Sequence, residues 1–172
     1  MQASSPDPLT DRHLSLFGAI VQSFARYERL MSEIIATAAD VDPNFAFIAT
    51  READFEGKRR TVLNVLRYRK VPIDKYDRVR MYLRIPHGLA GLLHDIIHST
   101  WTSVSSSNWI QPDWVLDLPP AVRPSLGEVD AEFIQSADEK VGYTIEDMSE
   151  ALRSLSLNFN EFSDYVKELR LS

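Results

Sequence analysis

Apolar residues recur at steps of three and four along the first forty residues of the chain. They are Phe17, Ile20, Val21, Phe24, Tyr27, Met31, Ile34, Ile35 and Ala38. This period predicts a helix of about eight turns with one face in the core. We expect it to begin after Thr10, a suitable N-cap, with Asp11 placed where a negative charge favours the helix dipole. It should end before Pro43, and residues 1–8 are expected to form a disordered lead.

A second helical pattern extends from about Pro43 towards Tyr68. Its candidates for burial are Phe47, Phe55, Val62, Val65 and Leu66. Glycine is a poor helix former, so Gly57 allows a break between Thr50 and Gly57. The cations at positions 67, 69 and 70 suit the C-terminal end of this helix.

A third helix is predicted over about Lys75–Thr100, and it contains a proline. Pro86 has no backbone N–H, so it should kink the helix or split it in two. Beyond this point a broad apolar surface is formed by Leu89, Leu92, Leu93, Ile96 and Ile97. The other side carries Arg80, Arg84, His87, Gly91, His94, His98 and Trp101, which follow one another at alternating steps of four and three. If the kink rotates the two halves little, one seam presents all of these side chains together.

Residues 101–127 form an insert that is rich in Ser, Trp and Pro. We expect a loop or a strand insert here, with short strands at 109–111 and 114–116 that can form a β-hairpin. Pro112–Asp113 would supply the turn between them. Residues 128–140 fit either a short acidic helix or an ordered loop.

The final helix has the clearest pattern in the chain. Thr144, followed three residues later by Asp147, approximates a capping box. The apolar positions after it are Met148, Leu152, Leu155, Phe159, Phe162, Val166 and Leu169, again at alternating steps of four and three. Such a narrow seam suits antiparallel packing within a bundle or a dimer contact.

These patterns together predict an all-α protein, with residues 1–172 forming a single up-and-down helical bundle of four to five helices. The absence of cysteine excludes disulfides, thiol nucleophiles and cysteine-based zinc sites. The N-terminus lacks the basic and apolar regions of a secretory signal, and no apolar run approaches the roughly 20 residues of a membrane span. We therefore expect a cytoplasmic protein with no membrane contact.

Charge is distributed unevenly along the chain. The net charge is −6, which argues against bulk binding of nucleic acid, yet Arg51–Arg84 carries 11 basic and 5 acidic residues. Such an asymmetry can mark a phosphate-binding face. Alternatively, the basic helices pack near the acidic ones or simply face solvent.

His94 and His98 invite a metal hypothesis, because histidines at i and i+4 can share an ion on one helical face. Asp95 stands where metalloproteases of the His-Glu-x-x-His type have their glutamate, and its shorter side chain is a poor substitute for that general base. No third ligand motif follows. A metal-dependent hydrolase is therefore the weakest of the hypotheses, and we expect no metal and no other cofactor.

The same seam contains the groups needed for metal-free phosphodiester cleavage. Histidine titrates near neutral pH and can move the proton of a ribose 2′-hydroxyl or protonate a leaving oxygen. Arginine can hold and neutralise the phosphate through paired N–H donors. The alternative is that His94 and His98 face solvent or shape a dimer seam without any chemistry.

The layout carries a family resemblance. The third helix ends in Leu-His-Asp-Ile-Ile-His-Ser-Thr-Trp, a Trp- and Pro-rich insert follows, and residues 143–148 open the last helix. This resembles the HEPN superfamily of small helical bundles, whose active helix carries a segment similar to Arg-Asn-x-x-Ala-His-Gly-x-Trp. His98 matches the histidine of that segment, Ser99 its small residue, Trp101 its aromatic residue and His94 its asparagine. Leu93 stands in place of its arginine.

A looser match, Arg80 to His87, follows an Arg-x(6)-His spacing but has Pro86 inside it. The motif of this chain is therefore a degenerate one. HEPN proteins with the intact motif are metal-independent ribonucleases, often toxins or defence proteins, and others bind nucleotides or have lost activity.

The resemblance implies a homodimer through the third helix, in which the two active helices face each other across a cleft. We expect an RNA- or nucleotide-binding protein with a degenerate or altered ribonuclease centre, and any enzymatic activity would be that of a metal-independent endoribonuclease. His98 is the expected acid–base, with His94 as its partner. The expected phosphate contacts are Arg84, Arg80 and His87. The competing hypothesis is a non-enzymatic dimeric interaction module.

Overall fold

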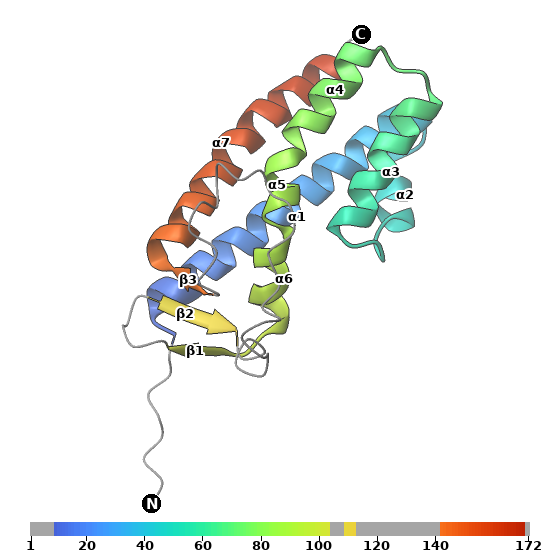
Figure 1. Ribbon diagram of the computed structural model, residues 1–172. Coiled ribbons are helices and arrows are strands. Elements are labelled where there is room, and N and C mark those ends of the chain that lie inside the picture. Colours follow the sequence, from blue (N-terminus) through green and yellow to red (C-terminus); the bar gives the residue numbers. More distant parts are fainter. Residues whose placement is uncertain (1–8, 104–108, 113–141, 171–172) are drawn as a thin grey trace, which may run out of the picture.

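The computed structural model describes residues 9–103, 109–112 and 142–170 (Figure 1). Within these ranges the chain is an all-α helical bundle with a small sheet at one end, which confirms the predicted fold class. The described residues form seven helices instead of four to five, because the predicted second and third helices are divided. The order of elements is α1 (Asp11–Ala39), α2 (Pro43–Ala49), α3 (Phe55–Tyr68), α4 (Ile73–Tyr82), α5 (Arg84–Gly88), α6 (Ala90–His98), β1 (Trp101–Ser103), β2 (Trp109–Pro112), β3 (Tyr143–Thr144) and α7 (Ile145–Arg170).

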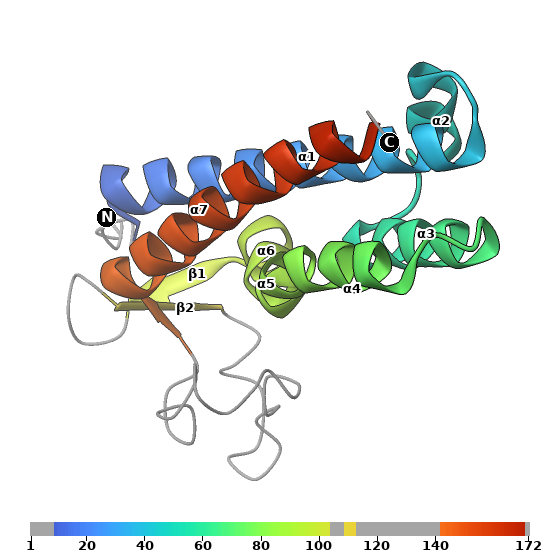
Figure 2. The same ribbon diagram turned by 90° about the horizontal axis from the view of Figure 1, so that it is seen from above.

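The helices run up and down the bundle, with α1 and α7 side by side (Figures 1 and 2). Both of these helices begin at the end of the molecule that carries the sheet, so they run in the same direction. Helices α4, α5 and α6 follow one another in the opposite direction, and α4 and α5 pack against α7. The last helix therefore packs antiparallel to this column, as its apolar seam predicted, but parallel to α1.

The start of α1 is set by a capping box at the predicted residue. The Thr10 side chain accepts the backbone N–H of His13 at 3.4 Å, and His13 Nδ1 accepts the backbone N–H of Thr10 at 3.1 Å. These reciprocal bonds satisfy two of the N–H groups that a helix leaves without partners at its first turn. At the other end Asp40 adopts the left-handed conformation and ends the helix.

The predicted break between Thr50 and Gly57 is present and separates α2 from α3. Its cause is a cap: the Asp54 carboxylate accepts the backbone N–H of Gly57 at 2.7 Å. A Cβ at Gly57 would lie 2.9 Å from that same carboxylate oxygen. Gly57 thus makes room for the cap of α3, besides being a weak helix former. Phe47, a predicted core residue, is 48% exposed because α2 buries only Ala46.

The predicted third helix is divided into α4, α5 and α6, with boundaries at Leu83 and Leu89. Pro86 lies in the first turn of α5, where a proline destabilises a helix little. Because Pro86 has no backbone N–H, it cannot continue the hydrogen-bonding pattern of α4. The segments follow one another without a connecting loop, because the Leu83 and Leu89 carbonyls already accept the N–H groups of His87 and Leu93, each at 3.2 Å. We call these three helices the α4–α6 column.

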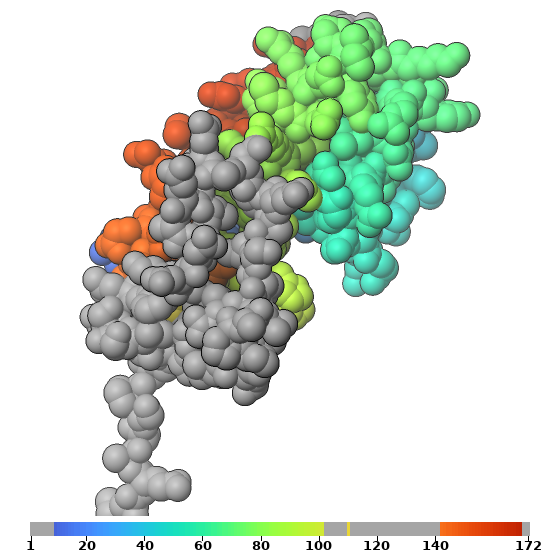
Figure 3. All heavy atoms as spheres, viewed as in Figure 1, coloured from blue at the N-terminus to red at the C-terminus, as the bar shows by residue number. Residues whose placement is uncertain are grey.

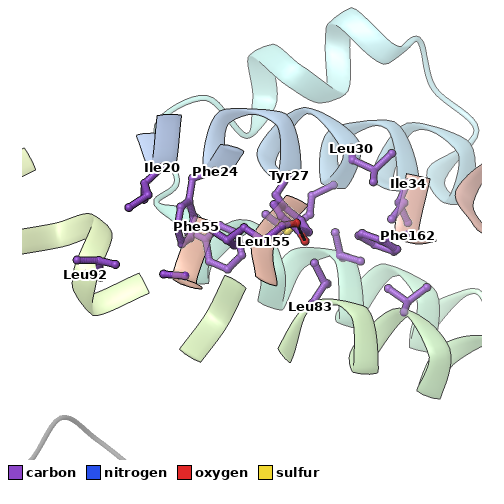
Figure 4. Packing of buried hydrophobic residues seen from close by; sticks show 14 of the residues in the cluster. Ile20, Phe24, Tyr27, Leu30, Ile34, Phe55, Leu83, Leu92, Leu155 and Phe162 are labelled. Atoms are coloured by element: carbon purple, nitrogen blue, oxygen red, sulfur yellow. Dashed lines mark hydrogen bonds between the residues drawn. The ribbon is translucent and has the colours of Figure 1, made fainter. Parts of the chain in front are cut away.

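The core lies between α1, α7, α3 and the α4–α6 column, and Figure 4 shows its centre. Most of the predicted α1 stripe is buried there, although Val21 is exposed. Met148, Leu155 and Phe162 of the α7 seam are fully buried. Leu92 of α6 lies near Ile20, at one end of the row of core residues (Figure 4).

The insert contributes strands to a small antiparallel sheet of order β1–β2–β3. Trp101 pairs with Pro112, and Ile110 pairs with both Ser103 and Tyr143. The predicted strand at 109–111 is confirmed as part of β2. Trp101 belongs to β1, so the helical seam of the third helix ends at His98, and this corrects the prediction that Trp101 continues it.

Several predictions fall outside the described residues. They are the disordered lead at 1–8, the second strand at 114–116 and the segment at 128–140. The predicted turn at Pro112–Asp113 is wrong for its first residue, because Pro112 is the last residue of β2 and pairs with Trp101, while Asp113 lies outside the described residues. Among the helices that the structure describes, none has the length and apolarity needed to cross a membrane.

Candidate functional site

The structure places the predicted site residues along the outside of the α4–α6 column. Arg80 lies in α4, Arg84 and His87 in α5, and His94 and His98 in α6, and all five side chains are exposed. The prediction that Pro86 leaves them on a shared surface depends on how little the segments rotate. All five are exposed, and their placement on one shared face stays a prediction.

His94 and His98 lie side by side on α6. Their ring centroids are 4.7 Å apart and the ring planes are tilted by 45°. This is the geometry that one helical turn gives to residues at i and i+4. The two imidazoles therefore lie next to each other at the surface, as the spacing predicts.

His87 has a carboxylate partner that the sequence pattern does not reveal. Its Nδ1 atom lies 3.1 Å from Oε2 of Glu56 in α3. Arg59 donates two hydrogen bonds to the same carboxylate, at 2.7 and 2.8 Å, and Arg60 lies 3.8 Å from it. The hydrogen bonds from Arg59 are the main reason why the pKa of Glu56 is lowered from its ordinary value, and His87 contributes further. His87 thus ties α5 to α3 at one edge of the surface.

Asp95 lies between the two histidines in sequence but belongs to the interior. It is buried, and the Tyr143 hydroxyl donates a hydrogen bond to its Oδ2 atom at 2.9 Å. Burial and the neighbouring carboxylate raise the pKa of Tyr143 well above its ordinary value, so it stays a donor. Asp95 therefore joins α6 to β3. In the described part of the chain no three His, Asp or Glu side chains converge as a metal site.

Two further positions of the HEPN-like motif, Trp101 and Leu93, face the core. Trp101 is 8% exposed and packs against Phe17 and Tyr143, with ring centroids 4.9 and 6.0 Å away. Leu93 is half-buried against the same core, so the position of the family's arginine presents no charge. Arg84 lies on the separate helix α5, beyond the break at Leu89.

The basic segment is partly buried in ion pairs and partly exposed. Lys58 is buried in an ion pair with Glu28 of α1, and Arg59 and Arg60 share Glu56. This fits the interpretation that basic helices pack near acidic groups. The remaining cations of the segment are largely exposed on α3, on α4 and at the turn between them, the face shown in teal and green in Figure 3. These exposed cations fit the alternative that basic residues face solvent, and a phosphate-binding face stays a prediction.

A hollow that the sequence pattern does not indicate lies between α4 and α7, at the far end of the column from His98. Its volume is about 520 Å³, and its walls are Asp74, Lys75, Arg78, Tyr165, Glu168 and Leu169. The Arg78 guanidinium lies 5.3 Å from the centre of the Tyr165 ring, and burial raises the pKa of Tyr165. Acidic and basic groups are mixed here, so the hollow has no clear preference for an anion.

Fold and surface together define an all-α helical bundle with an exposed column of arginine and histidine side chains. Comparison with protein-family models, with curated proteins and with solved structures found no match to this chain.

Proposed function

We propose that this protein is a HEPN-like homodimer that binds RNA, or nucleotides of the same chemistry, through the exposed face of the α4–α6 column. The observation that carries the proposal is the exposure of Arg80, Arg84, His94 and His98 along one column of consecutive helices. Guanidinium groups spaced along such a column suit the repeating phosphates of a polymer.

The adjacent imidazoles of His94 and His98 supply the acid–base chemistry of a metal-independent ribonuclease. One ring can accept a proton from a 2′-hydroxyl while the other protonates the leaving oxygen. Leu93 removes the cation that the family places next to this centre, so less charge is stabilised in the transition state. We therefore propose that binding is retained and that any endoribonuclease activity is weak.

The test is binding of a fluorescent single-stranded RNA, measured by anisotropy over a series of salt concentrations with EDTA present. We expect the affinity to fall steeply with salt, and Arg84→Ala to reduce the slope of log K against log salt by about one. The Arg84→Ala/His98→Ala protein should lose binding at moderate salt. Arg153→Ala, on the exposed side of α7, removes the same charge elsewhere and should match the wild type. No binding at low salt, or equal losses in the two arginine variants, would reject the proposal.

A second candidate is a non-enzymatic dimeric interaction module, and one observation favours it. Ile97 is 54% exposed on α6 next to His94 and His98, and exposed Gly91 lies one turn before His94. An exposed isoleucine beside a small residue suits contact with another helix. Sedimentation of the His94→Ala/His98→Ala protein in EDTA separates the two functions. The dimer weakens if the histidines only shape an interface, and it persists if they serve RNA.

A further inference from the structure

We propose that His94 and His98 form half of a zinc site, and that the same pair from a second copy of the chain completes it. The site would hold one Zn²⁺ ion with four imidazole ligands, and it would bridge the α6 helices of two subunits.

His94 and His98 are placed so that both can bind the same ion. The ring centroids are 4.7 Å apart on successive turns of α6, and both side chains are exposed. Histidines at i and i+4 on one helical face are a recurrent way to hold zinc with two nitrogens. Neither ring is tied to a described carboxylate, in contrast to His87, which contacts Glu56.

The number of ligands that zinc needs indicates a second chain. Zn²⁺ in proteins is almost always four-coordinate in structural sites. Asp95, the nearest carboxylate in sequence, is buried and engaged with Tyr143, and the described residues contain no set of three ligands. One chain thus offers two of the four positions. A twofold symmetric contact brings the same surface of both copies together and therefore supplies two pairs at once.

The surroundings of the pair suit such an approach. Gly91 has no side chain to hold a second helix away, and it lies one turn before His94 on the exposed side of α6. Ile97, which is 54% exposed, would be covered by the contact and would add apolar area around the ion. Four protein ligands leave no open position for a water molecule, so this ion would be structural and would not hydrolyse a substrate.

This inference goes beyond the proposed function, although it uses the same two histidines and also needs a second copy of the chain. Imidazoles bound to zinc cannot act as acid and base, so the two roles are tested under separate conditions. RNA binding is measured in EDTA, whereas the zinc site is measured without RNA. Each proposal can therefore fail while the other holds.

The test is a calorimetric titration of the purified, EDTA-treated and dialysed protein with ZnCl₂, paired with sedimentation velocity. We expect one Zn²⁺ per two chains and a larger dimer fraction with Zn²⁺ than with EDTA. His94→Ala and His98→Ala should each weaken zinc binding by at least about a hundredfold, because one ligand of each chelating pair is lost. His87→Ala is the matched control, since it removes a histidine from the same column, and it should bind zinc as the wild type does.

Co²⁺ provides an independent measurement, because tetrahedral coordination by nitrogen gives visible absorption bands far stronger than those of octahedral Co²⁺. We expect strong bands with the wild type and His87→Ala, and weak bands with His98→Ala. Unchanged zinc affinity in His94→Ala and His98→Ala would overturn the proposal. One Zn²⁺ per chain with no change in sedimentation would overturn the bridging by a second copy.

Discussion

The Tyr27 hydroxyl donates a hydrogen bond to the backbone carbonyl of Leu155 at 3.0 Å and lies 2.6 Å from Oδ1 of Asn158. This relationship joins α1 to α7 in the middle of the core, where Tyr27 and Leu155 are both fully buried (Figure 4). A polar group in such a place is tolerated because its hydrogen-bonding capacity is satisfied. Tyr27 therefore determines how the two parallel helices are aligned.

Replacing Tyr27 with phenylalanine should destabilise the protein. The ring still fills its space, but the buried Leu155 carbonyl loses its donor and the half-buried Asn158 side chain loses the hydroxyl beside it, which costs about 1–3 kcal/mol. The measurement is the free energy of unfolding from a urea titration followed by circular dichroism. Tyr68→Phe removes the same hydroxyl from a side chain that is 84% exposed, and it should change this free energy by less than about 0.5 kcal/mol. Equal effects of the two substitutions would contradict the role of the Tyr27 hydroxyl.

Stability should fall in alkaline solution because of the same residue. Burial raises the pKa of Tyr27 well above the ordinary tyrosine value of about 10. Tyrosine then ionises first in the unfolded chain, so the unfolded state binds fewer protons and the free energy of unfolding decreases as pH rises past about 10. Burial of Tyr143 acts in the same direction. Urea titrations between pH 8 and 11 should show a smaller decrease for Tyr27→Phe than for the wild type, and an identical decrease would refute this account.

The ion pair between Lys58 and Glu28 should respond differently to the loss of each partner. The Lys58 side chain is almost fully buried, whereas that of Glu28 is 30% exposed. Glu28→Gln leaves a buried ammonium group without its carboxylate and should cost about 2 kcal/mol or more. Lys58→Met removes the buried charge and keeps the packing volume, so its cost should be clearly smaller. Thermal unfolding of both variants tests this order, and a larger loss for Lys58→Met would show it to be wrong.

Two helical glycines should give opposite results when changed to alanine. A Cβ at Gly18 meets no atom within 4 Å, so Gly18→Ala should stabilise α1 by about 0.5–1 kcal/mol. A Cβ at Gly57 would displace the Asp54 carboxylate that caps α3, and the lost cap of about 1 kcal/mol cancels or exceeds the gain. The difference in unfolding free energy between the two variants is the measurement. A Gly57→Ala protein as stabilised as Gly18→Ala would exclude the capping role of Asp54.

Features that depend on neighbours in the sequence could be predicted from it. Thr10 begins α1, the break before Gly57 is present, and the α7 seam lies in the core, because caps and helical periods act over one to two turns. The i, i+4 pair of His94 and His98 is also local, and the two rings are adjacent as expected.

The partners of these groups could not be predicted, because they come from helices far away along the chain. Glu56 meets His87, Tyr143 meets Asp95, and Trp101 enters the core beside Phe17. Each contact depends on the breaks at Leu83 and Leu89 and on how the α4–α6 column packs against α3, β3 and α1. The spacing of residues by itself determined which side chains share a turn of helix. Tertiary packing alone decided which of them face a carboxylate, the core or solvent, since packing angles are set by contacts between distant segments.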